Sequence, residues 1–267
     1  MPLITVLTRD PAVISALHAP PGGTLSVART RSWSRLLWLV RERPVTGVVL
    51  DSAALPDDQD QDAVVRELHR RFPSLAIVFI ERPGFDPWVL LRLGRAGISD
   101  LVLVHLDALA GELLRGTARS GARSTASFLA RAIGARLPAR ERHVLRTALD
   151  GALLGWGADD LAAYTGWTRA HLSVCLRGRG LPSAGHLLTW AKLLHAGRWL
   201  SDPGRSAESI SRQLGYSSGA AFRRALRNYV GGTPTSVRER GGLRLVLGRF
   251  LDVCGLRGSL GADQSAA

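Results

Sequence analysis

The hydrophobic positions of this chain follow one rhythm up to residue 116 and another beyond it. In the first part, five short runs consist mostly of apolar residues, and amphipathic stretches separate them. The runs are ITVLT (4–8), LSVAR (25–29), VTGVVLD (45–51), LAIVFIE (75–81) and LVLV (101–104). Such runs are typical of strands that are buried on both faces of a parallel sheet. We therefore expect residues 1–116 to form an α/β domain with a five-stranded, doubly wound parallel sheet.

The stretches between these runs predict helices, because their apolar residues recur at helical spacing. The expected helices span 10–18, 32–42, 62–72, 86–97 and 106–116. Asp10 is expected to cap the first helix, and Pro11 to occupy its first position, where the missing proline N–H costs nothing. Each strand is thus followed by one helix, as a doubly wound fold requires.

Beyond residue 116 the strand-like runs disappear. Residues 117–138 begin with a stretch rich in Gly, Ser, Ala and Arg, and we interpret them as a linker. Residues 139–240 contain helical patterns only, which predicts an all-α domain. Residues 241–267 contain one more amphipathic stretch and then a tail that we expect to be disordered.

Two similar blocks lie in the helical half. They read DDLAAYTGWTRAHLSVCLRGRGL (159–181) and ESISRQLGYSSGAAFRRALRNYVGG (208–232). Each predicts a short helix, a Gly-aromatic-Ser/Thr turn and a longer helix. Gly166 and Gly215 fall where the chain turns in a left-handed conformation, and Thr168 and Ser217 are expected to cap the second helix of each block. The blocks predict two helix-turn-helix units, joined by a long helix within 183–202.

The charge of the chain is concentrated in this helical half. Residues 1–120 hold 14 basic and 13 acidic side chains, whereas residues 121–267 hold 21 basic and 9 acidic ones. The second set therefore carries +12 of the total formal charge of +13. This asymmetry indicates a polyanionic partner for the helical domain.

The composition narrows the class of protein. A hydrophobic content of 46% is typical of globular proteins, and no apolar run approaches the ~20 residues of a transmembrane helix. Cys175 and Cys254 form no motif, so we expect neither a disulfide nor a metal site. We expect a cytoplasmic protein that has no membrane partner and no cofactor.

The five strand–helix units resemble the receiver domain of bacterial response regulators. Asp51 ends the third run, where that family carries its phosphoacceptor aspartate, and Leu55–Pro56 resembles the Met-Pro turn of the family. The family also has two acidic Mg²⁺ ligands after the first strand, but Thr8 and Arg9 stand there in this chain.

The remaining receiver chemistry is also replaced. Ile80 stands where the family has Thr or Ser, and Val104 or His105 where it has lysine. Because phosphoryl transfer depends on a metal and on cations, we interpret the domain as a pseudo-receiver that senses a signal or mediates dimerisation. Asp51 would be a vestigial phosphoacceptor.

The two helix-turn-helix units on one connecting helix resemble the DNA-binding domain of the AraC/XylS family of transcription regulators. The second unit carries the residues typical of that family at its spacing. These residues are Ile210, Leu214, Gly215, Tyr216, Phe222, Arg224, Leu226, Gly232, Thr233, Pro234 and Arg238. The resemblance implies that the second helix of each unit enters a major groove of duplex DNA.

The resemblance also implies which residues of the second unit contact DNA. Phe222, Ala225, Leu226 and Tyr229 recur at helical spacing and are expected to face the core. The residues expected to contact DNA are Ser217, Ser218, Gly219, Ala220, Arg223, Arg224 and Arg227.

The first unit departs from the family pattern, because Val174 stands where the family usually has arginine. The expected DNA contacts of this unit are Arg169, His171, Ser173 and Arg177. The unit either reads bases or contacts phosphates only, through Arg169, Arg177 and Arg179.

We therefore expect a sequence-specific, DNA-binding transcription regulator and not an enzyme, because no acid–base or nucleophile constellation is present. The alternative is a non-catalytic signalling or scaffold protein that binds DNA without sequence preference. Double-stranded DNA is the expected partner. The resemblance leaves open a homodimer through the N-terminal domain and a contact with RNA polymerase.

Overall fold

The computed structural model describes residues 3–16, 26–56, 60–82, 84, 86–103, 126, 128–130, 132–134 and 137–256. The chain divides into two compact units. The first comprises Met1–Ser124 with Asp202–Arg205, and the second comprises Thr125–Ser201 with Ser206–Ala267. The predicted helix at 106–116, most of the predicted linker and the C-terminal tail lie outside the described residues.

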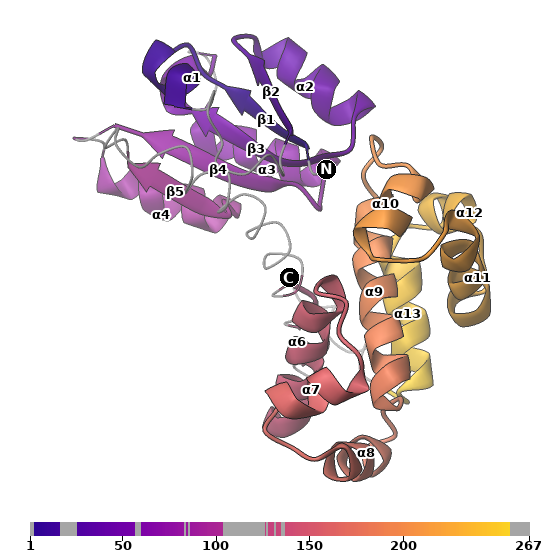
Figure 1. Ribbon diagram of the computed structural model, residues 1–267. Helices are drawn as coiled ribbons and strands as arrows, with labels where there is room; N and C mark the ends of the chain where they lie inside the picture. The colour runs from indigo at the N-terminus through magenta and orange to yellow at the C-terminus, as the bar shows by residue number, and fades with distance from the viewer. Residues whose placement is uncertain are drawn as a thin grey trace, which may run out of the picture. The chain divides into compact units, whose positions relative to one another are not determined.

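A five-stranded parallel sheet forms the centre of the first unit (Figure 1). The strands are β1 (Leu3–Leu7), β2 (Ser26–Thr30), β3 (Val45–Asp51), β4 (Ala76–Glu81) and β5 (Asp100–Leu103). They lie in the order β2-β1-β3-β4-β5, and every pair of neighbours is parallel. The strand order reverses between β1 and β3, the place where doubly wound sheets carry their sites. The predicted fold of this unit is confirmed.

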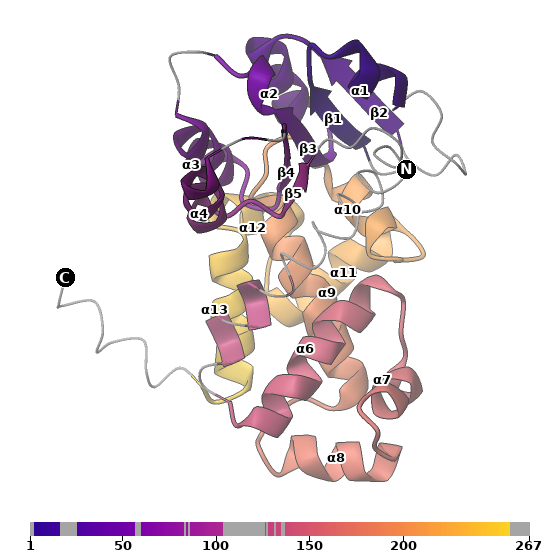
Figure 2. The ribbon, with the colours of Figure 1, turned by 90° about the vertical axis from the view of Figure 1, so that its left-hand side faces the viewer.

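Helices cover both faces of this sheet (Figure 2). The described helices are α1 (Pro11–Ala16), α2 (Trp33–Glu42), α3 (Gln61–Arg71) and α4 (Pro87–Ala96). Successive residues of β3 point to opposite faces, so Val48 and Leu50 pack with α2, α3 and α4, whereas Val49 packs with Val13 of α1. A short 3-10 turn, η1 (Ser52–Ala54), follows β3.

The second unit is helical throughout its described residues, as predicted. Its helices are α6 (Ala139–Leu153), α7 (Ala158–Tyr164), α8 (Arg169–Arg177), α9 (Ala184–Leu200), α10 (Ala207–Gln213), α11 (Gly219–Val230), α12 (Pro234–Glu239) and α13 (Leu243–Val253). Residues 128–130 and 132–134 are also helical, and Leu129 and Ile133 are buried in the same core. The packed part of this unit therefore begins before residue 139.

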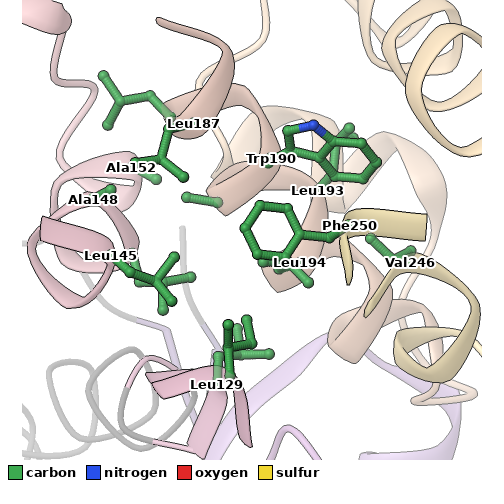
Figure 3. Packing of buried hydrophobic residues seen from close by; sticks show 14 of the residues in the cluster. Leu129, Leu145, Ala148, Ala152, Leu187, Trp190, Leu193, Leu194, Val246 and Phe250 are labelled. Atoms are coloured by element: carbon green, nitrogen blue, oxygen red, sulfur yellow. The ribbon is translucent and has the colours of Figure 1, made fainter. Parts of the chain in front are cut away.

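Helix α9 is the central element of the second unit. Most of its residues are buried, and only its N-terminal turn is largely exposed. Figure 3 shows Leu187 of α9 near Ala152 of α6, and Trp190 of α9 beside Phe250 of α13. The Trp190 and Phe250 rings lie 5.6 Å apart, edge to face. One continuous core thus joins both helix-turn-helix units, so α9 sets their relative positions.

A glycine allows α13 to lie close against α9. A β-carbon at Gly197 would lie 2.9 Å from Val246 Cγ2 and 3.1 Å from Leu243 Cα. Any larger side chain would therefore push the two helices apart.

No helix within the described part of the chain is long and apolar enough to cross a membrane.

Candidate nucleic-acid interface

The second helix-turn-helix unit consists of α10, a glycine turn and α11. Gly215 takes a left-handed φ of 68°, which L-residues with side chains rarely adopt. Ser218 is the N-cap of α11, because its Oγ accepts a hydrogen bond of 3.1 Å from the Ala221 N–H. The predicted cap, Ser217, was wrong by one residue. The turn of this unit is one residue longer than the turn that leads from Gly166 to the N-cap Thr168.

Large side chains anchor the inner face of α11. Phe222 and Leu226 are fully buried, and Ala225 and Tyr229 pack against the same core, as their spacing predicted. Tyr229 lies edge to face with Trp190 at 5.3 Å. These contacts fix the rotation of α11 about its axis and therefore determine which residues point outward.

The outer face of α11 carries arginines together with small side chains. Arg223, Arg224 and Arg227 are exposed, and none of the ion pairs among the described residues involves them. Ser217, Ser218 and Ala220 at the start of the helix are exposed as well. The guanidinium groups are thus available to bases or phosphates, and short side chains lie beside them.

Gly219 lies at a close contact that leaves no room for a side chain. It is buried, and a β-carbon there would collide with the Glu208 carboxylate and lie 3.2 Å from Arg223 Nη1. Gly219 was predicted to contact DNA, but it is buried, unlike its neighbours Ser218 and Ala220, and its lack of a side chain lets α11 start beside α10. At the far end of the unit, Arg238 Nε donates a 3.0 Å hydrogen bond to Leu200 O, which ties α12 to α9.

The first helix-turn-helix unit has the same plan, with α8 as its second helix. Gly166 takes a φ of 72°, and Thr168 Oγ1 accepts a 3.2 Å hydrogen bond from the His171 N–H, as predicted for this cap. Leu172 and Leu176 are the buried residues of α8. Thr168, Leu172 and Leu176 therefore correspond to Ser218, Phe222 and Leu226 of α11.

Two of the three arginines of the first unit are engaged within the protein. Arg169 Nη1 lies 3.2 Å from Asp159 Oδ1, in a pair with both side chains exposed. Arg179 Nε donates a 3.2 Å hydrogen bond to the buried carboxylate of Glu141, which also lies near Cys175 Sγ. Burial and the Glu141 charge raise the pKa of the Cys175 thiol. Within the described residues, Arg177 takes part in no ion pair, unlike Arg169 and Arg179.

The other predicted residues of α8 divide between its surface and its interior side. His171 is exposed and lies edge to face with Trp167 at 4.9 Å, whereas Ser173 is half-buried. Val174 is 67% exposed, although it is apolar. The outer face of α8 therefore differs in chemistry from the arginine face of α11.

The two units also differ in formal charge. Residues 157–181 contain three arginines and two aspartates, whereas residues 206–240 contain six arginines and two glutamates. The units lie toward opposite ends of α9, with α7 and α8 near its start and α10 and α12 near its end (Figures 1 and 2). The 17 residues of α9 span about 25 Å. The second helix-turn-helix unit therefore carries more formal positive charge than the first.

A second candidate site lies at the carboxyl edge of the sheet, where Asp51 ends β3. Asp51 is buried, and Thr8 Oγ1 donates a 2.6 Å hydrogen bond to its Oδ2. Arg82, directly after β4, donates to Asp51 Oδ1 at 2.9 Å and to Asp10 Oδ2 at 3.1 Å. The hydrogen bonds with Asp51 raise the pKa of the Arg82 guanidinium.

This arrangement does not fit the Mg²⁺ ion of receiver domains. A guanidinium bridges the two carboxylates, and the Ala53 N–H donates a third hydrogen bond to Asp51, at 3.1 Å. No group of three or more potential ligands occurs among the described residues. Arg82 was missed in the sequence, although its place after β4, at the edge where β1 and β3 also end, was a usable signal.

Comparison with known proteins supports the helix-turn-helix assignment. Residues 161–240 match the family model described as "Helix-turn-helix domain". They form a helix-turn-helix domain of the AraC type, as the sequence resemblance predicted. A search of curated proteins gives no match.

Several solved structures are similar to this chain. A response regulator from Thermotoga maritima is 17% identical, with 44% of this chain and 98% of that chain covered and a TM-score of 0.37. The CheY-like protein tadZ from Pseudomonas aeruginosa PAO1 is 25% identical, with coverage of 45% and 94% and a TM-score of 0.35. Full-length FixJ from B. japonicum is 13% identical, with coverage of 84% and 95% and a TM-score of 0.40.

Proposed function

We propose that this protein is a sequence-specific transcription regulator that reads duplex DNA mainly through α11, and whose receiver-like domain does not accept phosphate. The observation that carries the proposal is the exposed trio Arg223, Arg224 and Arg227 on a helix with a fully anchored inner face. The N-terminal domain then serves sensing or dimerisation.

The division of roles follows from the positions of these residues. Arginine can donate two hydrogen bonds to guanine O6 and N7 in the major groove, whereas contacts with phosphate position the protein without reading sequence. Arg224 lies one turn after Ala220, whose methyl group leaves room for a base edge. We assign base reading to Arg224, and phosphate or base contacts to Arg223 and Arg227.

Binding to selected and random duplex DNA at two salt concentrations tests this proposal. A specific regulator keeps a large ratio of affinities at about 150–200 mM salt, because base contacts depend little on counterions. The same loss of affinity for both DNAs would instead support the alternative, a non-catalytic signalling or scaffold protein with only cationic DNA binding.

The proposal that the receiver-like domain does not accept phosphate is based on the hydrogen bonds that the Asp51 carboxylate already accepts. Its oxygens already accept hydrogen bonds from Thr8, Ala53 and Arg82. Attack on a phosphoryl donor needs a free carboxylate oxygen and a cation that neutralises the transferred group. We expect no stable mass increase of about 80 Da at Asp51 after incubation with acetyl phosphate and Mg²⁺. Such an adduct would overturn this part of the proposal.

The homodimer and the contact with RNA polymerase remain predictions. The size of the full chain in solution, with and without operator DNA, tests the first of them. A monomer at all concentrations would limit the N-terminal domain to sensing.

A further inference from the structure

The corresponding positions of α8 and α11 carry opposite chemistry. The N-caps Thr168 and Ser218 and the buried residues that follow them put the two helices in one register. In this register Val174 corresponds to Arg224. An arginine that can donate two hydrogen bonds is thus replaced by a side chain that can donate none.

Val174 has no role in packing that would explain its presence. It is 67% exposed, and it is absent from the cluster of buried residues and from the half-buried residues that contact it. Leu172 and Leu176 supply the inner face of α8. Val174 therefore lies on the face of α8 that is free to meet a partner.

The residues around Val174 suit contact with a DNA groove. Ala170 lies one turn before it and Arg177 one turn after it, and both are exposed. The small side chain of Ala170 allows close approach, and the Arg177 guanidinium can reach a phosphate. Ala170, Val174 and Arg177 thus form a ridge along α8 that has an apolar centre and one cation.

The major groove offers one apolar group to such a ridge, the C5-methyl of thymine. We infer that Val174 is a specificity-determining residue that contacts a thymine methyl group, so that the half-site of the first unit depends on thymine at that position. The half-site of the second unit then depends on guanine. This inference rests on the proposed function, because it assumes that α8 enters a major groove.

Replacement of single thymines by deoxyuridine tests the inference, because it removes only the methyl group. An operator is first selected from random duplexes with the full chain. Each thymine of the half-site of the first unit is then replaced in turn, and affinity is measured for the wild type and Val174→Ala. One replacement should weaken wild-type binding about fourfold, as expected for one buried methyl group, and should weaken Val174→Ala less than about twofold.

A matched control separates this effect from general loss of apolar surface. Val253 of α13 is also an exposed valine, at 55%, and Val253→Ala should keep the full deoxyuridine effect. Thermal unfolding should show that both variants remain folded. An equal deoxyuridine effect in Val174→Ala and the wild type, or the absence of any sensitive thymine, would overturn the inference. Failure to select any operator would instead count against the proposed function.

Discussion

The Arg82 guanidinium lies 2.9 Å from one carboxylate oxygen of Asp51 and 3.5 Å from the other. Asp51 is 1% exposed, whereas the side chain of Arg82 is 42% exposed. A buried carboxylate therefore obtains its compensating charge from a side chain at the protein surface. An arginine that directly follows β4 thus pairs with the carboxylate that ends β3.

Replacing Arg82 by alanine should destabilise the first unit by about 1–2 kcal/mol, since it leaves the buried Asp51 charge with Thr8 and Ala53 as its remaining partners. Chemical denaturation measures the change. Arg95→Ala, an exposed arginine on α4, removes the same charge and should change stability by less than about 0.5 kcal/mol. Equal effects of the two substitutions would show that the Asp51 contact contributes nothing.

Arg224→Ala should weaken binding to the selected operator by about 1–3 kcal/mol if the guanidinium reads a guanine. Binding to random DNA should change little beyond the loss of one charge. Arg249→Ala on α13 is the matched control, because it removes an exposed arginine from the same unit. Titrations of both variants against both DNAs give the comparison, and a uniform loss across sequences would reassign Arg224 to phosphate contact.

Gly197→Ala should destabilise the helical half of the chain by about 1–3 kcal/mol. The new methyl group would meet the backbone of α13 at Leu243 Cα, 3.1 Å away. Gly185→Ala lies in the same helix and meets nothing within 4 Å. It should be neutral or stabilise by up to about 1 kcal/mol. If urea denaturation ranks the two variants in the reverse order, the close approach of α9 and α13 is not needed for stability.

The free energy of unfolding of the helical half of the chain should fall as the pH drops from 6.5 toward 4. Burial lowers the pKa of His195 to about 4, and its Nε2 lies 2.9 Å from Leu149 O. Its Nδ1 has no hydrogen-bond partner among the described residues. Between pH 6.5 and 4, His195 is protonated in the unfolded chain but stays neutral in the folded chain. The folded state therefore loses about 3 kcal/mol of stability relative to the unfolded state by pH 4.

The difference between wild type and His195→Gln isolates this effect from the carboxylates that titrate at similar pH. The variant should lose the slope between pH 6.5 and 4, whereas His143→Gln, an exposed histidine of the same unit, should retain it. Denaturation at several pH values gives the comparison, and parallel curves for all three proteins would contradict the assignment to His195.

Tyr216→Phe should leave stability unchanged or raise it by up to about 1 kcal/mol, because the buried Tyr216 hydroxyl finds no hydrogen-bond partner in the part of the chain that the structure describes. Burial also raises the pKa of this hydroxyl to about 12. Phe222→Ala, which removes the ring that contacts Tyr216 at 5.4 Å, should cost about 3–5 kcal/mol. A marked loss in Tyr216→Phe would reveal a partner for the hydroxyl, such as a bound water molecule.

Local patterns in the sequence were sufficient to predict much of the fold. The apolar runs predicted five parallel strands, and the spacing of Phe222, Ala225, Leu226 and Tyr229 predicted the inner face of α11. Both depend on the repeat of a strand or a helix, which is a local property. The cap of α11 was misplaced by one residue, because two adjacent serines can both serve as caps and packing selects between them.

The sequence by itself determined the fold classes, the two helix-turn-helix units and the concentration of positive charge in the second half of the chain. Tertiary structure decided which charges are available. Arg82 reaches Asp51, and Arg179 reaches Glu141, only because elements distant in the chain pack together. Hydrogen bonds and ion pairs act over a few ångströms in space, whereas periodicity acts along the chain. The free arginines of α11 and the exposed Val174 of α8 were therefore distinguishable only once the helices were packed.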